Sequence, residues 1–233
     1  MKRNLFRSLA LLVPVLFLAC SLLCAQEIRK FDFKNFNRVE ASSGMHVQIT
    51  QSGNYSVEVK ASDRDLKQLL VEQHGNKLEF KLKGWFHHLN DEIYIKITMP
   101  KLNYISLSGG SMGNISMDNS SENFEADLSG GAKLKGNLKC ADASFELSGG
   151  SWMNVSGSGK NLKVDGSGGS QFKLKDFAVG NVNSELSGGS YAEVRMNGKL
   201  NADQSGGSRT VYYGNASMGR SDLSGGSSVS KGE

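Results

Sequence analysis

The amino-acid sequence predicts an all-β protein, a single-chain parallel β-solenoid with coils of about 20 residues. The first observation is that the triplet Ser-Gly-Gly occurs seven times, and six of the seven copies read Ser-Gly-Gly-Ser. The second is that successive triplets lie 21, 19, 19, 20, 18 and 19 residues apart. The third is that apolar and polar residues alternate between triplets, which is typical of half-buried strands. The triplets begin at Ser108, Ser129, Ser148, Ser167, Ser187, Ser205 and Ser224.

Residues 1–25 have the pattern of a secretory signal peptide. A basic start precedes an almost wholly apolar run from Leu9 to Leu23, and we expect cleavage after Ala25. The alternative is lipidation of Cys20, because the Leu-Ala-Cys sequence there partly matches a bacterial lipobox. Either route predicts export to the periplasm, the outer-membrane surface or the extracellular space.

The charge and cysteine content exclude some functions and one source of stability. Removal of the three basic residues of the leader leaves 24 Lys and Arg against 23 Asp and Glu, a net charge of +1. Global charge therefore gives no support to a nucleic-acid partner. Only Cys140 remains after cleavage, so no intramolecular disulfide is expected. A continuous solenoid core is the expected source of stability instead.

Residues 26–100 lack the triplet period and are predicted to form a β-rich cap with one short helix, continuous with the solenoid. The alternating runs 45–49 and 55–59 flank a Gly-Asn turn and predict a hairpin. Ser62, followed by acidic residues, predicts the start of the helix. Further strands are predicted over 78–82 and 93–98. Such a cap would cover the edge of the first coil, which could otherwise pair with other chains.

Histidine residues in this segment raise the question of a metal site. Adjacent residues on a strand point to opposite faces, so His87 and His88 cannot both face one ion from a strand. No Cys or carboxylate lies at ligand spacing from this pair. We therefore expect an exposed loop there, and we expect no metal at His46 or His74.

Residues 101–233 are predicted to form the solenoid, with two strands in each coil. Aligned on the triplets, the first, third and fifth residues before each triplet are mostly apolar or small and are expected to face the core. A second inward column follows the triplet and comprises Leu134, Met153, Phe172, Ala192, Thr210 and Val229. Seven coils at a spacing of about 4.8 Å would make a rod about 30 Å long.

The triplets are interpreted as corners between the two strands. Glycine adopts positive φ and allows the next coil to approach closely, and the serine hydroxyls can bond nearby backbone groups. A phosphate-binding glycine loop is the alternative. It is disfavoured because no helix pattern follows the triplets and no Gly-Lys-Ser/Thr sequence occurs.

The second residue before the triplet is acidic in six of seven coils, and we call these residues the acidic column: Asp127, Glu146, Asp165, Glu185, Asp203 and Asp222. Neighbouring carboxylates about 4.8 Å apart repel by only about 0.9 kcal/mol in bulk water, so a solvated acidic face is expected. Binding of calcium along the column is the alternative, and no other metal or cofactor is predicted.

The first outward position after the triplet gives a second column with aromatic, amide and basic side chains. We call it the aromatic column, and its candidate ligand-binding residues are Lys133, Trp152, Gln171, Tyr191 and Arg209. Trp152 and Tyr191 would lie two coils apart, about 10 Å. Exposed aromatic rings on a flat face suit contact with a glycan or a protein, and ordinary solenoid surface is the alternative.

At this level of detail the sequence resembles the GIN-domain family, a family of auto-transporter adhesin heads. The resemblance rests on Phe36-Asn37-Arg38-Val39, on Val47-Gln48-Ile49, on the segment from Ile93 to Pro100 leading into Leu102, and on the repeated Leu-Ser-Gly-Gly-Ser. It covers nearly all of the chain after the leader. It implies a secreted or periplasmic β-solenoid with an adhesion role and gives no catalytic residues to carry over.

Three functional hypotheses follow. The first is a non-enzymatic secreted or cell-envelope protein that binds a glycan or a protein through a solenoid face. The second is a polysaccharide-acting β-helix enzyme, by fold analogy and because carboxylate pairs exist in the acidic column. The third is a structural envelope protein that self-associates through the last coil, from Leu223 to Val229, whose edge could pair with another chain.

Overall fold

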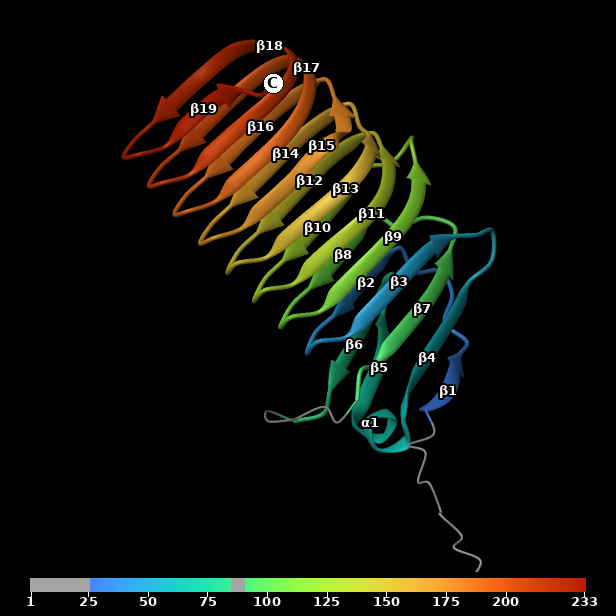
Figure 1. The fold of residues 1–233 in the computed structure, drawn as a ribbon. Helices are drawn as coiled ribbons and strands as arrows, with labels where there is room; N and C mark the ends of the chain where they lie inside the picture. The colour runs from blue at the N-terminus through green and yellow to red at the C-terminus, as the bar shows by residue number, and fades with distance from the viewer. Residues whose placement is uncertain (1–25, 85–90) are drawn as a thin grey trace, which may run out of the picture.

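The computed structural model of the protein describes residues 26–84 and 91–233. The predicted signal peptide, Cys20 and the His87-His88 pair lie outside these residues. Within them, no helix is long and apolar enough to cross a membrane. The described part contains 19 strands and one short helix, and the β-solenoid predicted from the sequence is confirmed (Figure 1).

Each coil contributes one strand to each of two rows, which face each other across the core (Figure 1). The first row comprises β2 (Arg38–Ala41), β8 (Tyr104–Leu107), β10 (Phe124–Leu128), β12 (Asp142–Leu147), β14 (Asn161–Gly166) and β16 (Asn181–Leu186). The second row comprises β3 (His46–Gln51), β9 (Met112–Asn119), β11 (Lys133–Cys140), β13 (Trp152–Ser158), β15 (Gln171–Val179) and β19 (Ser228–Lys231). The long strands β17 (Tyr191–Gln204) and β18 (Arg209–Leu223) begin in the second row and end in the first.

Successive coils pair in parallel, so residues of one column are direct neighbours. Trp152 lies opposite Lys133 on one side and Gln171 on the other. In the first row, Glu146 lies between Asp127 and Asp165 in the same way. Residues that lie one triplet interval apart in the sequence are therefore neighbours on adjacent strands of a row.

The core lies between the two rows and runs through the whole stack. Inward side chains alternate with outward ones in each strand, as the period of two predicts. The rings of Phe124, Phe145 and Phe177 are fully buried and contact one another, with centroids 6.3 and 5.9 Å apart. Burial decreases in the last coil, where Met218 and Leu223 of β18 are 48% and 44% exposed.

The Ser-Gly-Gly triplets form the corners between the rows. In five of the seven triplet corners the serine that follows the triplet donates its hydroxyl to the carbonyl of the triplet serine, as in Ser151 Oγ to Ser148 O at 2.7 Å. In the first three corners both glycines have positive φ, whereas in the last four only the first glycine does. The second glycine thus has a φ of +80° at Gly150 and lies outside the positive-φ region at Gly169.

The stack begins one coil earlier than the triplet period indicates. Strands β2 and β3 pair in parallel with β8 and β9 and form a complete coil inside the segment expected to be the cap. Its corner is Ser42-Ser43-Gly44, with positive φ at Ser43 and Gly44. This corner has serine in place of the first glycine, so it does not belong to the Ser-Gly-Gly period.

The predicted hairpin between residues 45–49 and 55–59 is wrong. Strand β4 (Ser56–Ser62) does not pair with β3, because β7 (Tyr94–Met99) lies between them. β7 is parallel to β3 and antiparallel to β4, and in this central position it buries Ile95 and Ile97. Strand β1 (Gln26–Phe31) then covers the outer edge of β4.

The remaining elements extend the first row. Helix α1 (Asp63–Gln68) is capped by Ser62, whose Oγ accepts a hydrogen bond from the Asp65 N–H at 3.2 Å, as the sequence predicts. The strands β5 (Leu69–His74) and β6 (Lys77–Leu82) are antiparallel, and β6 continues the row by pairing with β2.

Candidate functional site

The aromatic column lies on the outer surface of the second row. Lys133, Trp152, Gln171, Tyr191 and Arg209 occupy consecutive strands and are paired in register. Side chains of this column are exposed or half-buried. The strands that carry them come from five successive coils, so the column forms a straight line across the face.

The alignment of the triplets also places Met112 in this column, and the structure extends the column by two further residues, His46 and Tyr94. Met112 lies next to Lys133, His46 lies next to Met112, and Tyr94 lies next to His46. The rings of His46 and Tyr94 are in tilted contact, with centroids 5.0 Å apart. His46 directly follows the corner of the first coil, as Met112 follows its triplet, and this signal could have placed it. Tyr94 requires the pairing of β7 with β3.

The two aromatic side chains of the predicted site differ in how firmly they are held. The Tyr191 hydroxyl donates to Glu193 Oε1 at 2.8 Å, and Lys173 Nζ lies 4.4 Å from the centre of the ring. Burial, followed by the hydrogen bond to Glu193, raises the pKa of Tyr191 to about 12. The Trp152 ring is half-buried, and its indole N–H has no hydrogen-bond partner within the described chain. Trp152 is therefore an aromatic side chain of the column whose hydrogen-bond donor is unused.

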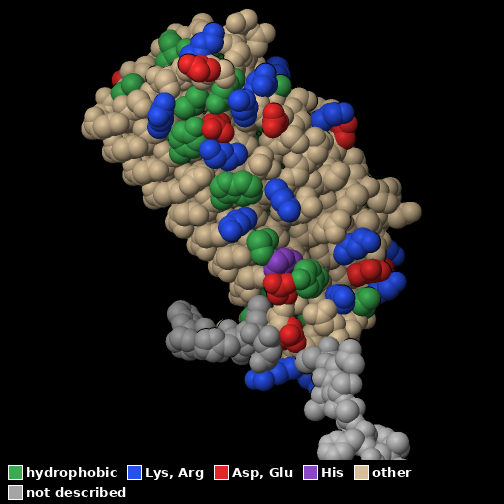
Figure 2. Space-filling view, viewed as in Figure 1, with side chains coloured by type: hydrophobic (Ala, Val, Ile, Leu, Met, Phe, Trp, Pro, Cys, Tyr) green, Lys and Arg blue, Asp and Glu red, His purple; other side chains and the backbone are tan. Residues whose placement is uncertain are grey.

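The two rows carry opposite net charge on their strands. The second row, counted with β4, β7 and residues 191–197 and 209–215, has ten Lys and Arg against four Asp and Glu. The first row, counted with β5, β6 and residues 198–204 and 216–223, has eleven Asp and Glu against six Lys and Arg. We call the second row the basic face, and Figure 2 shows Lys, Arg and hydrophobic side chains running along it.

A hollow of about 630 Å³ lies at the N-terminal end of the basic face. It extends over β4, β7, β3, β9 and β11. Its lining includes Tyr94, His46 and Met112 from the aromatic column. The sequence did not predict this hollow, because it depends on the pairing of the non-repeating strands β4 and β7.

The acidic column lies on the first row, and several of its carboxylates have partners. Lys163 Nζ lies 3.5 Å from Glu185 and 4.0 Å from Asp165, and Arg220 lies 2.6 Å from Asp222. These cations come from the neighbouring outward column of the same row. The arrangement agrees with a solvated, ion-paired face, and calcium binding there stays a prediction.

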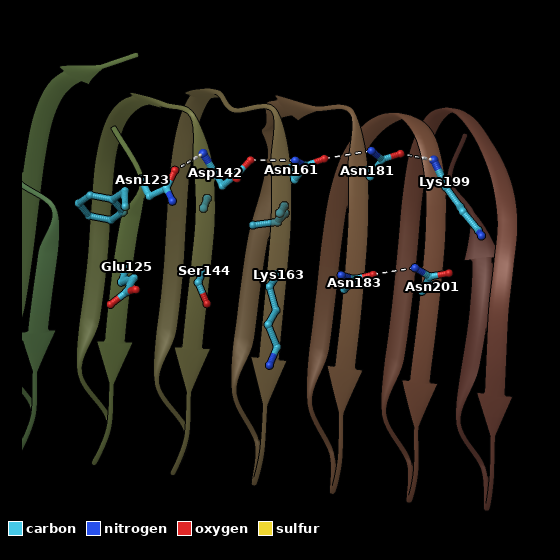
Figure 3. A pocket seen from close by; sticks show the side chains of 13 residues that line it. Asn123, Glu125, Asp142, Ser144, Asn161, Lys163, Asn181, Asn183, Lys199 and Asn201 are labelled. Carbon is cyan, nitrogen blue, oxygen red and sulfur yellow. Dashed lines mark hydrogen bonds between the residues drawn. The ribbon is translucent and has the colours of Figure 1, made fainter. Parts of the chain in front are cut away.

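A groove of about 560 Å³ runs beside the acidic column, over β10, β12, β14 and β16 (Figure 3). Its rim is a ladder of side-chain amides and a carboxylate. Asn161 donates to Asp142 at 2.8 Å, Asn181 donates to Asn161 at 3.0 Å, and the Lys199 N–H donates to Asn181 at 2.9 Å. Because these groups hydrogen-bond to one another from coil to coil, the ladder stabilises the stacking of successive coils. This structural role explains its presence without a ligand. The recurrence of Asn or Asp near this position in each coil is the sequence signal for it.

One group of potential metal ligands occurs among the described residues. Glu72, His74 and Glu79 lie together on β5 and β6. Lys81 Nζ lies 2.9 Å from Glu72 and 3.1 Å from Glu79, so an ammonium group already bridges both carboxylates. Hydrogen bonds from Lys81 and then His74 lower the pKa of Glu72. The cluster is accounted for as a surface ion-pair network.

Comparison with known proteins places this architecture in a family. Residues 35–216 match the family model described as "Putative auto-transporter adhesin, head GIN domain". The chain belongs to the GIN-domain family. The resemblance inferred from the sequence motifs is thus confirmed. No curated protein matches this GIN domain.

Solved structures from Bacteroides and Parabacteroides species have the same fold. A "putative adhesin" from Bacteroides fragilis has a TM-score of 0.78 and 17% identity, covering 89% of this chain and 96% of its own. A "putative adhesin" from Parabacteroides merdae has a TM-score of 0.70 and 16% identity, with 89% and 96% covered. A "putative lipid binding protein" from Parabacteroides distasonis has a TM-score of 0.68 and 16% identity, with 89% and 97% covered. At these identities the likeness concerns the fold of the GIN domain alone.

Proposed function

We propose that this GIN domain is a non-enzymatic, adhesin-like binding module of the cell surface or the secreted fraction. Its family is named for adhesin heads, and the structural relatives described as adhesins share its fold. The finer part of the proposal is that the basic face binds a surface glycan or a protein through the aromatic column. The observation that carries it is the half-buried Trp152, which holds a free indole N–H within a flat column.

Physical chemistry supports this use of the column. Aromatic side chains with few rotatable bonds dominate binding energy at interfaces, and Trp and Tyr are the commonest such residues. Regular coil spacing places Trp152 and Tyr191 about 10 Å apart, so one extended ligand can contact both. Lys133 lies next to Trp152 and Arg209 lies next to Tyr191, and both add positive charge beside these rings.

The test is retention of purified protein on immobilised polysaccharides and extracellular-matrix proteins, with and without calcium. We expect selective retention and expect Trp152→Ala with Tyr191→Ala to weaken it at least 30-fold, the effect of losing about 2 kcal/mol at a binding hot spot. Ser144→Ala with Asn183→Ala, on the first row, is the matched control. Unchanged retention by the aromatic double variant would show that the column is not the site.

Two arms of the same experiment address the alternatives. Dependence of retention on calcium, abolished by Asp165→Asn with Glu185→Gln, would support metal binding by the acidic column. Release of soluble sugar from any polysaccharide by the purified protein would overturn the non-enzymatic part of the proposal. Determining the N-terminal residue of protein isolated from the envelope tests the predicted export. We expect the mature chain to begin at Gln26 and not at a lipidated Cys20.

A further inference from the structure

The hollow on the basic face contains two parallel lines of outward side chains. One line crosses β1, β4, β7, β3 and β9 and reads Ile28, Lys60, Tyr94, His46 and Met112. The other line lies two residues further along the same strands and continues onto β11, where Lys135 lies next to Asn114. Each strand contributes one residue to a line, so a molecule lying across the strands would contact residues from the whole width of the hollow.

The first line exposes a concentration of apolar surface. Ile28, Tyr94 and Met112 are 62%, 42% and 39% exposed, and they are three of the five large hydrophobic side chains that the described chain leaves exposed. All three line the same hollow. Two of these side chains are aliphatic or thioether groups, which favour contact with a hydrocarbon chain over stacking against a sugar ring.

The second line supplies positive charge that the protein does not neutralise. It begins with the ion pair of Lys30 and Glu58 and continues with Lys96 next to Glu58. Lys96 and Lys135 are separated by three strand steps or about 14 Å, with the shorter Gln48 and Asn114 between them. Lys60 lies beside Tyr94 in the first line. Within the described chain, none of the three lysines has an ion-pair or hydrogen-bond partner.

The carboxylates near the hollow are already engaged. Glu58, which lines it, is 3.0 Å from Lys30. Glu92 accepts a hydrogen bond from the Tyr94 hydroxyl and lies 3.8 Å from His46 Nε2. The hydrogen bond to Glu92 raises the pKa of Tyr94. Among the described residues that line the hollow, the charged groups without an ion-pair partner are therefore Lys60, Lys96 and Lys135.

We infer that this hollow binds a single anionic amphiphile, an alkyl chain that ends in a carboxylate or a phosphate. The alkyl chain lies along Ile28, Tyr94 and Met112, and the anionic group is bound by the lysines of the adjacent line. A volume of about 630 Å³ falls within the range of small-ligand sites, about 300 to 1,000 Å³. Because the surface is concave, it suits one molecule lying in the hollow better than the plane of a membrane. This inference is independent of the proposed function, since Trp152 and Tyr191 do not line the hollow.

Calorimetric titration of the protein from Gln26 onward, which contains every described strand, tests the inference. The probes are decanoate, octanoate and 1-decanol below their aggregation concentrations, and vesicles of anionic phospholipid. We expect one decanoate per protein. Octanoate should bind up to about 16-fold more weakly, because each buried methylene contributes a factor of about four. The neutral 1-decanol should bind at least tenfold more weakly than decanoate.

Variants of exposed residues locate the site without disturbing the core. Lys96→Gln with Lys135→Gln should weaken decanoate at least tenfold. The matched control, Lys199→Gln with Lys231→Gln, removes two partner-free lysines elsewhere and should change affinity less than twofold. Ile28→Ser with Met112→Ser should reduce the difference between decanoate and octanoate. Circular dichroism confirms that each variant is folded.

Four results would overturn the inference. They are the absence of saturable decanoate binding, equal affinity for decanoate and 1-decanol, binding to vesicles without binding of the monomeric probe, and loss of decanoate binding in the Trp152→Ala Tyr191→Ala variant. The last would place the amphiphile on the aromatic column instead of in the hollow.

Discussion

Two neighbouring corners of the solenoid offer a direct test of why glycine occupies the second position of the triplet. Gly150 and Gly169 are equivalent positions one coil apart, and a Cβ added at either would meet no atom within 4 Å. They differ in backbone conformation, because Gly150 has a φ of +80° and Gly169 lies outside the positive-φ region. Substitution by alanine at these two positions therefore measures the energetic cost of the backbone conformation without a steric clash.

The two alanine substitutions are expected to have different effects on the free energy of unfolding. Alanine at Gly150 must adopt a left-handed conformation, which costs about 1–2 kcal/mol. Restriction of the unfolded chain offsets about 0.4–1 kcal/mol of this cost, so Gly150→Ala should destabilise the protein by about 1 kcal/mol. At Gly169 only the second effect remains, and Gly169→Ala should leave stability unchanged or increase it by up to about 1 kcal/mol. Gly168→Ala should be worse than both, because its φ is +71° and its Cβ would lie 3.2 Å from the Gly149 nitrogen.

Urea unfolding followed by far-ultraviolet circular dichroism measures the difference. With a slope of about 2 kcal/mol per molar urea, a difference of about 1.5 kcal/mol between the two variants separates their midpoints by about 0.75 M. Coincident transitions by tryptophan fluorescence check that the variants unfold in the same way as the parent. Equal destabilisation by Gly150→Ala and Gly169→Ala would refute the argument, since the two corners would then differ in φ without any energetic consequence.

Three further outcomes are expected. Phe145→Ala should destabilise the protein by about 3–5 kcal/mol in the same urea assay, because the ring is fully buried between two others. Burial, and then the charge of Asp142, raises the pKa of the Cys140 thiol from 9.0 to about 12. Above pH 9 the unfolded chain releases this proton while the folded chain retains it, so stability should fall between pH 9 and 12 by up to about 1.4 kcal/mol per pH unit. Cys140→Ala should lose that part of the slope in unfolding measured from pH 8 to 11. Finally, exposed Met218 and Leu223 predict concentration-dependent self-association in sedimentation velocity, which Met218→Ser with Leu223→Ser should abolish; a single monomeric species of the parent protein at all concentrations would contradict this.

The repeating part of the fold could be predicted because each coil obeys the same local rules. Period-two alternation fixes which side chains face the core, and the distance between triplets fixes which residues become neighbours in the next coil. Leu134, Met153 and Phe172 illustrate this, since they are paired in register and fully buried. The first coil was missed because Ser43 stands where the later corners have glycine.

The non-repeating part could not be predicted in the same way, because its pairings join strands far apart in the sequence. Ser56 of β4 pairs with Thr98 of β7, and nothing in the intervening residues indicates that β7 enters between β3 and β4. The hollow depends on that insertion, because Lys60 and Lys96 come from β4 and β7 and belong to no column of the repeat. The aromatic column needed only the repeat, and its placement on one face follows from the alignment.

The direction of the hydrogen bonds between coils has a mechanical consequence. Strands lie across the stack, so the bonds between coils run along its length, with the cap at one end and the last coil at the other (Figure 1). A force that pulls the two ends apart acts parallel to these bonds and breaks them one coil after another, instead of loading all of them together. Each coil of about 20 residues that detaches adds about 65–70 Å of extended chain. A head domain built in this way lengthens stepwise under tension while the coils that have not yet detached keep their structure.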